Sequence, residues 1–237
     1  MQRKDLGRRI ASGVTAKLEF DYTCERGNSF SEYYLHGVIN EIIAALTSPT
    51  AYRIHTGYAH LALRQNEEIS RGRPRELDFF VEPYQKEEGA ACLEVKWAAS
   101  SHCRWDNVLL DLFRLALVKR NQPTTECLFV MSGPTNDVLR TLDDLKTRTM
   151  RPNRGKQSGA LQIPDASTPS SMVGYRAFDW AGRFSAGEGI AAHLPRTVRG
   201  RVDVPPKMYT TLAGSHTSAS GMWMTATWRL TTSSSVR

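Results

Sequence analysis

Two stretches of this sequence, Glu76-Leu77-Asp78-Phe79-Phe80-Val81 and Cys92-Leu93-Glu94-Val95-Lys96-Trp97, each predict a β-strand that carries charged side chains among apolar ones. Strand side chains alternate between two faces, so Glu94 and Lys96 point to one face and their apolar neighbours to the other. Asp is disfavoured inside strands, yet Asp78 stands between two apolar residues. Because charges on a partly buried strand cost free energy unless they are paired or have a task, these strands are the expected functional centre.

Helical and strand patterns flank these two strands. Apolar residues recur at helical spacing in Glu32–Leu46, which Pro49 follows. The other expected elements are an ambiguous strand in Ala51–Leu63, an apolar helix over Trp105–Lys119, a buried strand over Cys127–Met131 and a polar helix over Asn136–Thr147. Elements in this order predict a mixed central sheet with helices packed against it, an α/β (α+β) fold.

Composition divides the chain into four segments. They are a polar N-terminal segment (1–28) with a short strand near Lys17–Tyr22, a core (29–150), a loop or linker rich in Pro, Gly, Ser and Thr (151–175), and a basic, β-rich extension (176–237). The strands expected in or beside the extension are Tyr175–Phe184, Thr197–Val204 and a hairpin of Tyr209–Ala213 with Met222–Leu230. The sequence leaves open whether these strands extend the first sheet or form a separate lobe.

Asp78 and Glu94 would approach each other if their two strands are neighbours. Two carboxylates a few ångströms apart repel each other, and a bound divalent cation relieves that repulsion. Ligands that are all oxygen atoms suit Mg²⁺ or Mn²⁺. The pattern therefore predicts a site for one of these ions between the two strands.

The spacing of these charged residues resembles a known signature. Asp78 followed, after 15 residues, by Glu94-Val95-Lys96 is similar to the motif of the PD-(D/E)xK nuclease superfamily, which has the restriction-endonuclease-like fold. The flanking elements match that core's α-β-β-β-α-β order over residues 29–148, although Leu77 stands where the family has proline. The resemblance implies a metal-dependent deoxyribonuclease that hydrolyses phosphodiester bonds.

The same resemblance implies a set of metal ligands. Asp78, Glu94 and the backbone carbonyl of Val95 would bind Mg²⁺ or Mn²⁺, and a glutamate of the first core helix would hold the metal's water shell or a second ion. Glu32 lies near the centre of the apolar stripe of Glu32–Leu46 and Glu41 lies nearly opposite, so Glu32 is the candidate.

The resemblance also implies a role for Lys96 and a nucleic-acid partner. Lys96 would orient the attacking water or stabilise charge on the phosphate, while the metal lowers the pKa of that water. DNA is the expected partner, and a choice between DNA and RNA, endonuclease and exonuclease, or monomer and homodimer stays open. The alternative function is a non-catalytic nucleic-acid-binding or assembly protein that retains this fold.

Each candidate residue also has a purely structural explanation. Glu94 and Lys96 would suit the exposed face of an edge strand, and Asp78 would suit a turn or cap. Glu32 would complement the positive end of a helix dipole after the Ser31 cap.

Three polar residues of the apolar helix, Asn107, Asp111 and Arg114, form a stripe at helical spacing. The favoured interpretation is an exposed stripe with an ion pair between Asp111 and Arg114. The other interpretation is a layer of side chains directly behind the site.

The charge of the chain is unevenly placed. Its 237 residues carry a formal net charge of +7, and 41% hydrophobic with 23% charged residues excludes a collagen-like, coiled-coil or wholly disordered chain. Acidic and basic residues balance over 1–150, so the positive excess lies beyond Met150, where Arg196, Arg199 and Arg201 are candidate phosphate contacts. For the tryptophans of this part, core packing is favoured over base stacking: Trp180, Trp223 and Trp228.

The spacing of the cysteines and the length of the apolar runs limit which further classes of protein are expected. Cys24, Cys92, Cys103 and Cys127 form no CxxC pair, so reduced and mostly buried thiols are expected. No signal-peptide core follows the basic N-terminus, and no segment approaches the ~20 apolar residues of a membrane span. We therefore expect a soluble, cytoplasmic protein with no membrane partner.

Overall fold

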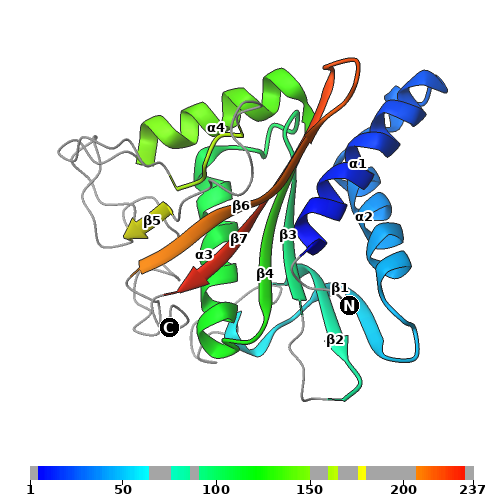
Figure 1. The fold of residues 1–237 in the computed structure, drawn as a ribbon. Helices are drawn as coiled ribbons and strands as arrows, with labels where there is room; N and C mark the ends of the chain where they lie inside the picture. Colours follow the sequence, from blue (N-terminus) through cyan, green and yellow to red (C-terminus); the bar gives the residue numbers. More distant parts are fainter. Residues whose placement is uncertain are drawn as a thin grey trace.

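A computed structural model describes residues 5–63, 76–85, 91–149, 160–164, 176–179 and 207–232. One mixed sheet runs through the described part, with helices against both of its faces (Figure 1). Its elements are α1 (Leu6–Thr23), η2 (Gly27–Ser29), α2 (Glu32–Leu46), β1 (Tyr52–Tyr58), η3 (Leu61–Leu63), β2 (Leu77–Pro83), β3 (Ala91–Trp97), α3 (Trp105–Asn121), β4 (Glu126–Pro134), α4 (Thr135–Thr149), β5 (Arg176–Asp179), β6 (Lys207–Thr217) and β7 (Trp223–Thr232).

The strands lie in the order β1-β2-β3-β4-β7-β6-β5. Among these described strands only β3 and β4 are parallel, because α3 carries the chain back across the sheet between them; the other neighbours are antiparallel. This arrangement confirms the expected mixed sheet with packed helices, and the core order α2-β1-β2-β3-α3-β4 matches the elements predicted from the sequence.

The N-terminal segment is helical, so the short strand predicted near Lys17–Tyr22 is wrong. Leu6, Ile10, Val14 and Leu18 recur every four residues along α1 and are buried against the sheet. The helix approaches β6 so closely that a Cβ on Gly214 would lie 2.5 Å from the Cα of Arg8. The small and polar residues between these four apolar positions hide the stripe in the sequence.

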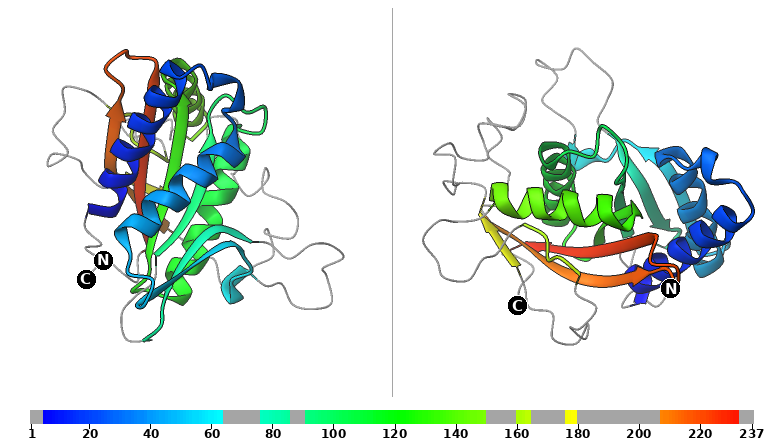
Figure 2. Two further views of the ribbon diagram at one scale, coloured as in Figure 1. Left: turned by 90° about the vertical axis from the view of Figure 1, so that its right-hand side faces the viewer. Right: turned by 90° about the horizontal axis from the view of Figure 1, so that it is seen from above.

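The C-terminal strands continue the first sheet and do not form a lobe of their own. β7 pairs with β4 from Cys127–Leu230 to Pro134–Trp223, and β6 pairs with β7, which confirms the predicted hairpin (Figure 2). The candidate strand at Thr197–Val204 lies outside the described residues. Of the candidate at Tyr175–Phe184, the described part is β5.

Two apolar layers sandwich the sheet. One layer lies under α3 and α4 and contains Trp228, which is fully buried beside Phe129. The other lies under α1 and α2 and contains Trp223, which is 7% exposed. The core interpretation is thus confirmed for both of these tryptophans, while Trp180 lies outside the described residues.

Thiol burial follows from the same layers. Cys92, Cys103 and Cys127 are buried and Cys24 is exposed, so most of the thiols are buried as expected. Among the described helices, none has both the length and the apolar character needed to cross a bilayer.

Candidate active site

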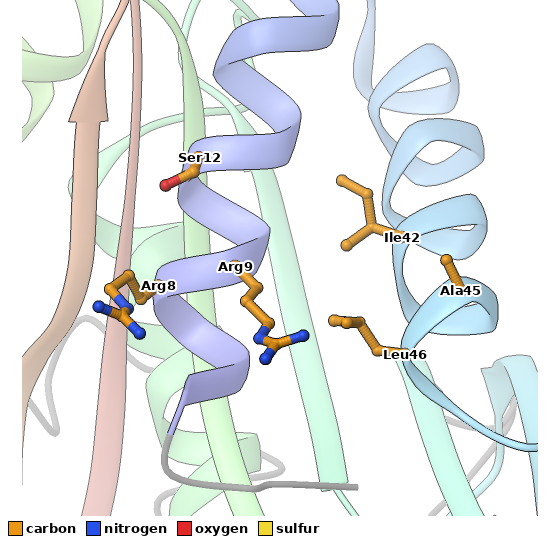
Figure 3. A pocket seen from close by; sticks show the side chains of 6 residues that line it. All are labelled: Arg8, Arg9, Ser12, Ile42, Ala45 and Leu46. Carbon is orange, nitrogen blue, oxygen red and sulfur yellow. The ribbon is translucent and has the colours of Figure 1, made fainter.

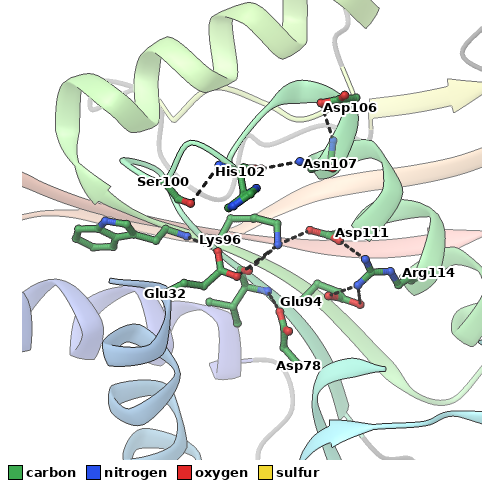
Figure 4. Close-up of polar contacts among 12 residues, drawn as sticks. Glu32, Asp78, Glu94, Lys96, Ser100, His102, Asp106, Asn107, Asp111 and Arg114 are labelled. Carbon is green, nitrogen blue, oxygen red and sulfur yellow. Dashed lines mark hydrogen bonds and ion pairs between the residues drawn. The ribbon is translucent and has the colours of Figure 1, made fainter. Parts of the chain in front are cut away.

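The predicted centre lies where β2 and β3 stop pairing with each other. Their register runs from Val81–Ala91 to Phe79–Leu93. Beyond that point Asp78 Oδ2 accepts a hydrogen bond of 2.7 Å from the backbone N–H of Val95 (Figure 4). The Asp78 side chain thus accepts the hydrogen bond that a carbonyl of a neighbouring strand would otherwise accept. This keeps a carboxylate at the point where β2 and β3 separate, which we call the fork.

Glu32 reaches the same fork from the start of α2. Ser31 caps the helix by accepting a hydrogen bond from the N–H of Tyr34, which sets Glu32 in the first turn. Glu32 Oε2 accepts from the N–H of Trp97 at 3.5 Å, and its Oε1 lies 3.8 Å from Lys96 Nζ. Glu41, the other candidate on α2, is exposed.

Further charged side chains come from β3 and α3, and with Glu32 and Asp78 they form one group, the Lys96 cluster. Lys96 Nζ lies 3.0 Å from Asp111 Oδ2, and Arg114 Nη2 lies 3.1 Å from Asp111 Oδ1. Arg114 Nη1 donates to both carboxylate oxygens of Glu94 at 3.1 Å. The side chains alternate as Glu94–Arg114–Asp111–Lys96, acid and base in turn, between β3 and α3 (Figure 4).

The favoured interpretation of the polar stripe on α3 is wrong. The ion pair between Asp111 and Arg114 exists, but Asp111 is 1% exposed and faces the sheet. Asn107 donates instead to the carbonyl of His102 and so ties down the loop between β3 and α3. The sequence did contain a signal for this contact. Two charges at i, i+3 on a helix lie about as far apart as two charges at i, i+2 on a strand, so Asp111 and Arg114 can pair with the charges of β3 when α3 covers that strand.

Burial of the Glu94 carboxylate explains why it needs a cation beside it. Its side chain is fully buried, and this desolvation, with repulsion from Asp111 and Asp78, raises its pKa well above the ordinary range even though Arg114 opposes the shift. Edge-strand exposure therefore does not explain this charge.

For the pKa of Lys96, neighbouring charges outweigh burial. Burial alone would lower its pKa, but the carboxylates of Asp111, Glu32 and Asp78 outweigh burial and raise it. Lys96 is therefore an ammonium at neutral pH, which can donate hydrogen bonds and neutralise negative charge but cannot take up a proton.

The cluster holds more carboxyl groups than permanent cations. Its carboxylates in the described part of the chain are Glu32, Asp78, Glu94 and Asp111, and its permanent cations there are Lys96 and Arg114. Beside them, the buried Nε2 of His36 lies 3.8 Å from Asp78 Oδ2 and has no hydrogen-bond partner among the described residues. The surplus of carboxyl groups favours a further, positively charged occupant.

The donor atoms fit a hard divalent cation, although not as a preformed cage. All candidate ligands are oxygens, as Mg²⁺ and Mn²⁺ require. Asp78 and Glu32 are 22% and 34% exposed at the side chain, so a cation could reach them from solvent, whereas Arg114 occupies both oxygens of Glu94. Within the described ranges, no group of three acidic, histidine or cysteine side chains is already arranged to hold a metal.

A hollow of about 480 Å³ between α1 and α2 lies apart from this cluster (Figure 3). Arg8, Arg9 and Ser12 of α1 line one side, and apolar residues near the end of α2 line the other. Because Glu32 begins α2 and Leu46 ends it, the hollow lies at the opposite end of α2 from the fork.

Comparisons with protein-family models, curated proteins and solved structures found no match for this chain.

Proposed function

We propose that this protein is a metal-dependent nuclease that hydrolyses phosphodiester bonds of DNA, with a core of the restriction-endonuclease-like kind. The observation that carries the proposal is the convergence of Glu32, Asp78 and Lys96 at the fork between β2 and β3, with Glu94 behind them. Acidic residues that outnumber the cations, beside a half-buried ammonium, suit a metal ion and a phosphate at one point.

The element order supports the same proposal. A helix, three antiparallel strands, a crossover helix and a parallel strand follow one another in α2-β1-β2-β3-α3-β4. The resemblance noted in the sequence rests on this order, with the acidic residues on the second and third strands.

Asp78, Glu32 and the carbonyl of Val95 would hold Mg²⁺ or Mn²⁺, and Glu94 would join them by sharing an oxygen now held by Arg114. The bound ion would lower the pKa of a bound water and neutralise charge that develops on the phosphate. Lys96, kept charged by Asp111, would donate hydrogen bonds to a phosphate oxygen or to the attacking water. Asp111 and Arg114 are positioning residues, since they touch Lys96 and Glu94.

Cleavage assays with Lys96→Ala test the role of the ammonium. Purified protein is incubated with single- and double-stranded DNA and Mg²⁺ or Mn²⁺, and loss of one charge-stabilising group should slow cleavage by about 10²–10³-fold. Lys146→Ala on α4 is the control and should cleave like wild type. Equal cleavage by wild type and Lys96→Ala would remove the assignment.

Metal binding gives a test that does not need cleavage. Titration calorimetry with Mn²⁺ should show Asp78→Asn binding at least about tenfold more weakly than wild type, because a charged ligand is lost. Asp144→Asn, at an exposed carboxylate on α4, should bind normally. Identical Mn²⁺ affinity of all three proteins would refute the metal site.

One observation favours the alternative function. Arg114 satisfies Glu94 without any metal, so the cluster could serve as a buried ionic network in a non-catalytic nucleic-acid-binding protein. Such a protein would bind DNA with salt-dependent affinity but take up no Mn²⁺.

A further inference from the structure

A second hollow, of about 420 Å³, lies where β4 ends and α4 begins. The turn between β6 and β7 and the end of α1 complete its wall. Its lining includes Tyr22, Thr135, Asn136, Ser220, Met222 and Trp223.

This hollow adjoins the candidate active site through two stacked tryptophans. The ring of Trp223 lies 6.2 Å from that of Trp97, with 29° between their planes. Trp97 directly follows Lys96, and its backbone N–H donates to Glu32. The register of β3, β4 and β7 places the fork and the hollow at the same end of the sheet, so a strand with a phosphate at the fork would run past this end.

The chemistry of the lining favours a neutral, planar ligand. The Tyr22 ring is 45% exposed and offers a face for stacking. Trp223 is 7% exposed, and its buried indole Nε1 has no hydrogen-bond acceptor among the described residues. A buried donor without a partner costs free energy, and a shift of the Trp223 ring that opened Nε1 to the hollow would let an acceptor atom on a ligand recover it.

An anion fits this hollow less well than a base. Of the described residues that line it, none has a charged side chain, and the first turn of α4 already carries Asp137, which opposes a phosphate there. The Thr135 hydroxyl donates to the carbonyl of Gly221 and so is already used. An aromatic ring with ring nitrogens or carbonyl oxygens would stack on the Tyr22 ring and would offer an acceptor to the indole N–H.

We propose that this hollow binds an unpaired nucleobase next to the phosphate at the Lys96 cluster. The inference rests on the proposed nuclease function and narrows its substrate to nucleic acid with an unpaired or readily extruded nucleotide beside the cut. A base inside a regular duplex would first have to leave its stack, which costs a few kcal/mol.

Binding to a fluorescein-labelled single-stranded DNA oligonucleotide, measured by anisotropy in EDTA, tests this without any cleavage. Tyr22→Leu should weaken binding about tenfold, the usual effect of losing one base–aromatic stack. Tyr33→Leu is the matched control, because the Tyr33 ring is 90% exposed outside the hollow. An abasic oligonucleotide of equal length and charge should bind more weakly than the normal one and with equal affinity to wild type and Tyr22→Leu.

Trp223→Phe gives an independent test of the base site in the same binding assay. It keeps an aromatic ring but removes the indole N–H, so binding should weaken about fivefold, the value of one hydrogen bond. Thermal melting of each variant verifies that it is folded.

The outcomes separate this inference from the nuclease proposal. Equal affinity of wild type, Tyr22→Leu and Trp223→Phe for the oligonucleotide overturns the base site, even if the protein cleaves DNA. DNA binding that depends on Tyr22, without cleavage or Mn²⁺ uptake, supports the base site. The base site would then belong to a non-catalytic nucleic-acid-binding protein. Equal affinity for the normal and abasic oligonucleotides overturns base recognition.

Discussion

Arg114 and Glu94 show how one ion pair sets the state of the whole cluster. Glu94 is fully buried, and Arg114 contacts both of its oxygens. Removing one member of a buried pair leaves the other charge without compensation, which is more costly than removing both. The pair therefore holds α3 against β3 at the place where the acidic residues gather.

Arg114→Met should lower the free energy of unfolding by about 3–5 kcal/mol at neutral pH, since it leaves Glu94 buried without a cation. Urea denaturation followed by circular dichroism measures the change. The additional substitution Glu94→Gln should recover part of the loss, because it removes a carboxyl group that must otherwise stay charged without a cation or take up a proton.

Arg140→Met is the control for this prediction. Arg140 pairs with Asp137 on the surface and is 74% exposed at the side chain, so its loss should cost only about 0–1 kcal/mol. Similar losses in Arg114→Met and Arg140→Met would show that the buried pair contributes no more than a surface one.

At the scale of elements, α1 and α2 are joined through Asp21. This carboxylate is 2% exposed, lies 2.7 Å from Lys17 Nζ and accepts a hydrogen bond from the hydroxyl of Tyr34 on α2. The hydrogen bonds from Lys17 and Tyr34 lower the pKa of Asp21 below its ordinary value. The ionised form therefore stabilises the contact between the two helices.

The sign of this shift gives a pH dependence. Because the pKa is lower in the folded state, the contribution of Asp21 is complete above about pH 5 and is lost as pH falls through the folded-state pKa. Asp21→Asn should thus be less stable than wild type at pH 7, and the two curves of unfolding free energy against pH should converge in acid. Asp143→Asn, at an exposed position on α4, should follow wild type at every pH. A constant gap between Asp21→Asn and wild type down to low pH would contradict the assignment.

Two glycines test how closely the elements pack. Gly214→Ala should destabilise the protein by about 1–3 kcal/mol, because its Cβ would lie 2.5 Å from the Arg8 backbone of α1. Gly37→Ala, within α2 and with no described atom within 4 Å of its Cβ, should stabilise by about 0.5–1 kcal/mol. Thermal melting of both variants measures the two signs, and a neutral Gly214→Ala would mean that α1 can move away from β6.

At the scale of the whole molecule, the charges divide along the chain. Acidic and basic residues balance up to Met150, which includes the acidic cluster, and the positive excess follows. For a nuclease this division would let carboxylates bind a metal while basic residues elsewhere hold the phosphate backbone.

Replacing Arg196, Arg199 and Arg201 by Gln should weaken DNA binding and flatten its salt dependence. Each arginine that ceases to neutralise a phosphate lowers the slope of log K against log salt by about 0.9, so the triple substitution should change it by about 2–3. Mn²⁺ affinity should stay the same, since a guanidinium is always charged and does not bind a metal cation. An unchanged slope, measured by anisotropy over a series of salt concentrations, would show that they do not bind phosphates.

Local periodicity was enough to predict α2, β2, β3, α3 and β4, and to place Glu94 and Lys96 on one face of their strand. The two-residue repeat of a strand and the 3.6-residue repeat of a helix depend only on the backbone of that element. The same reasoning selected Glu32 over Glu41, and the structure places Glu32 beside Lys96.

Tertiary structure decided which faces meet. α3 is apolar on nearly every side, so its own periodicity does not show that Asp111 and Arg114 turn toward β3 rather than solvent. The fork between β2 and β3, the pairing of β7 with β4 and the contact of Trp97 with Trp223 join residues far apart in the chain. The sequence by itself determined the local elements and their charged residues, and only the packing of the sheet and helices determined the partners of those charges.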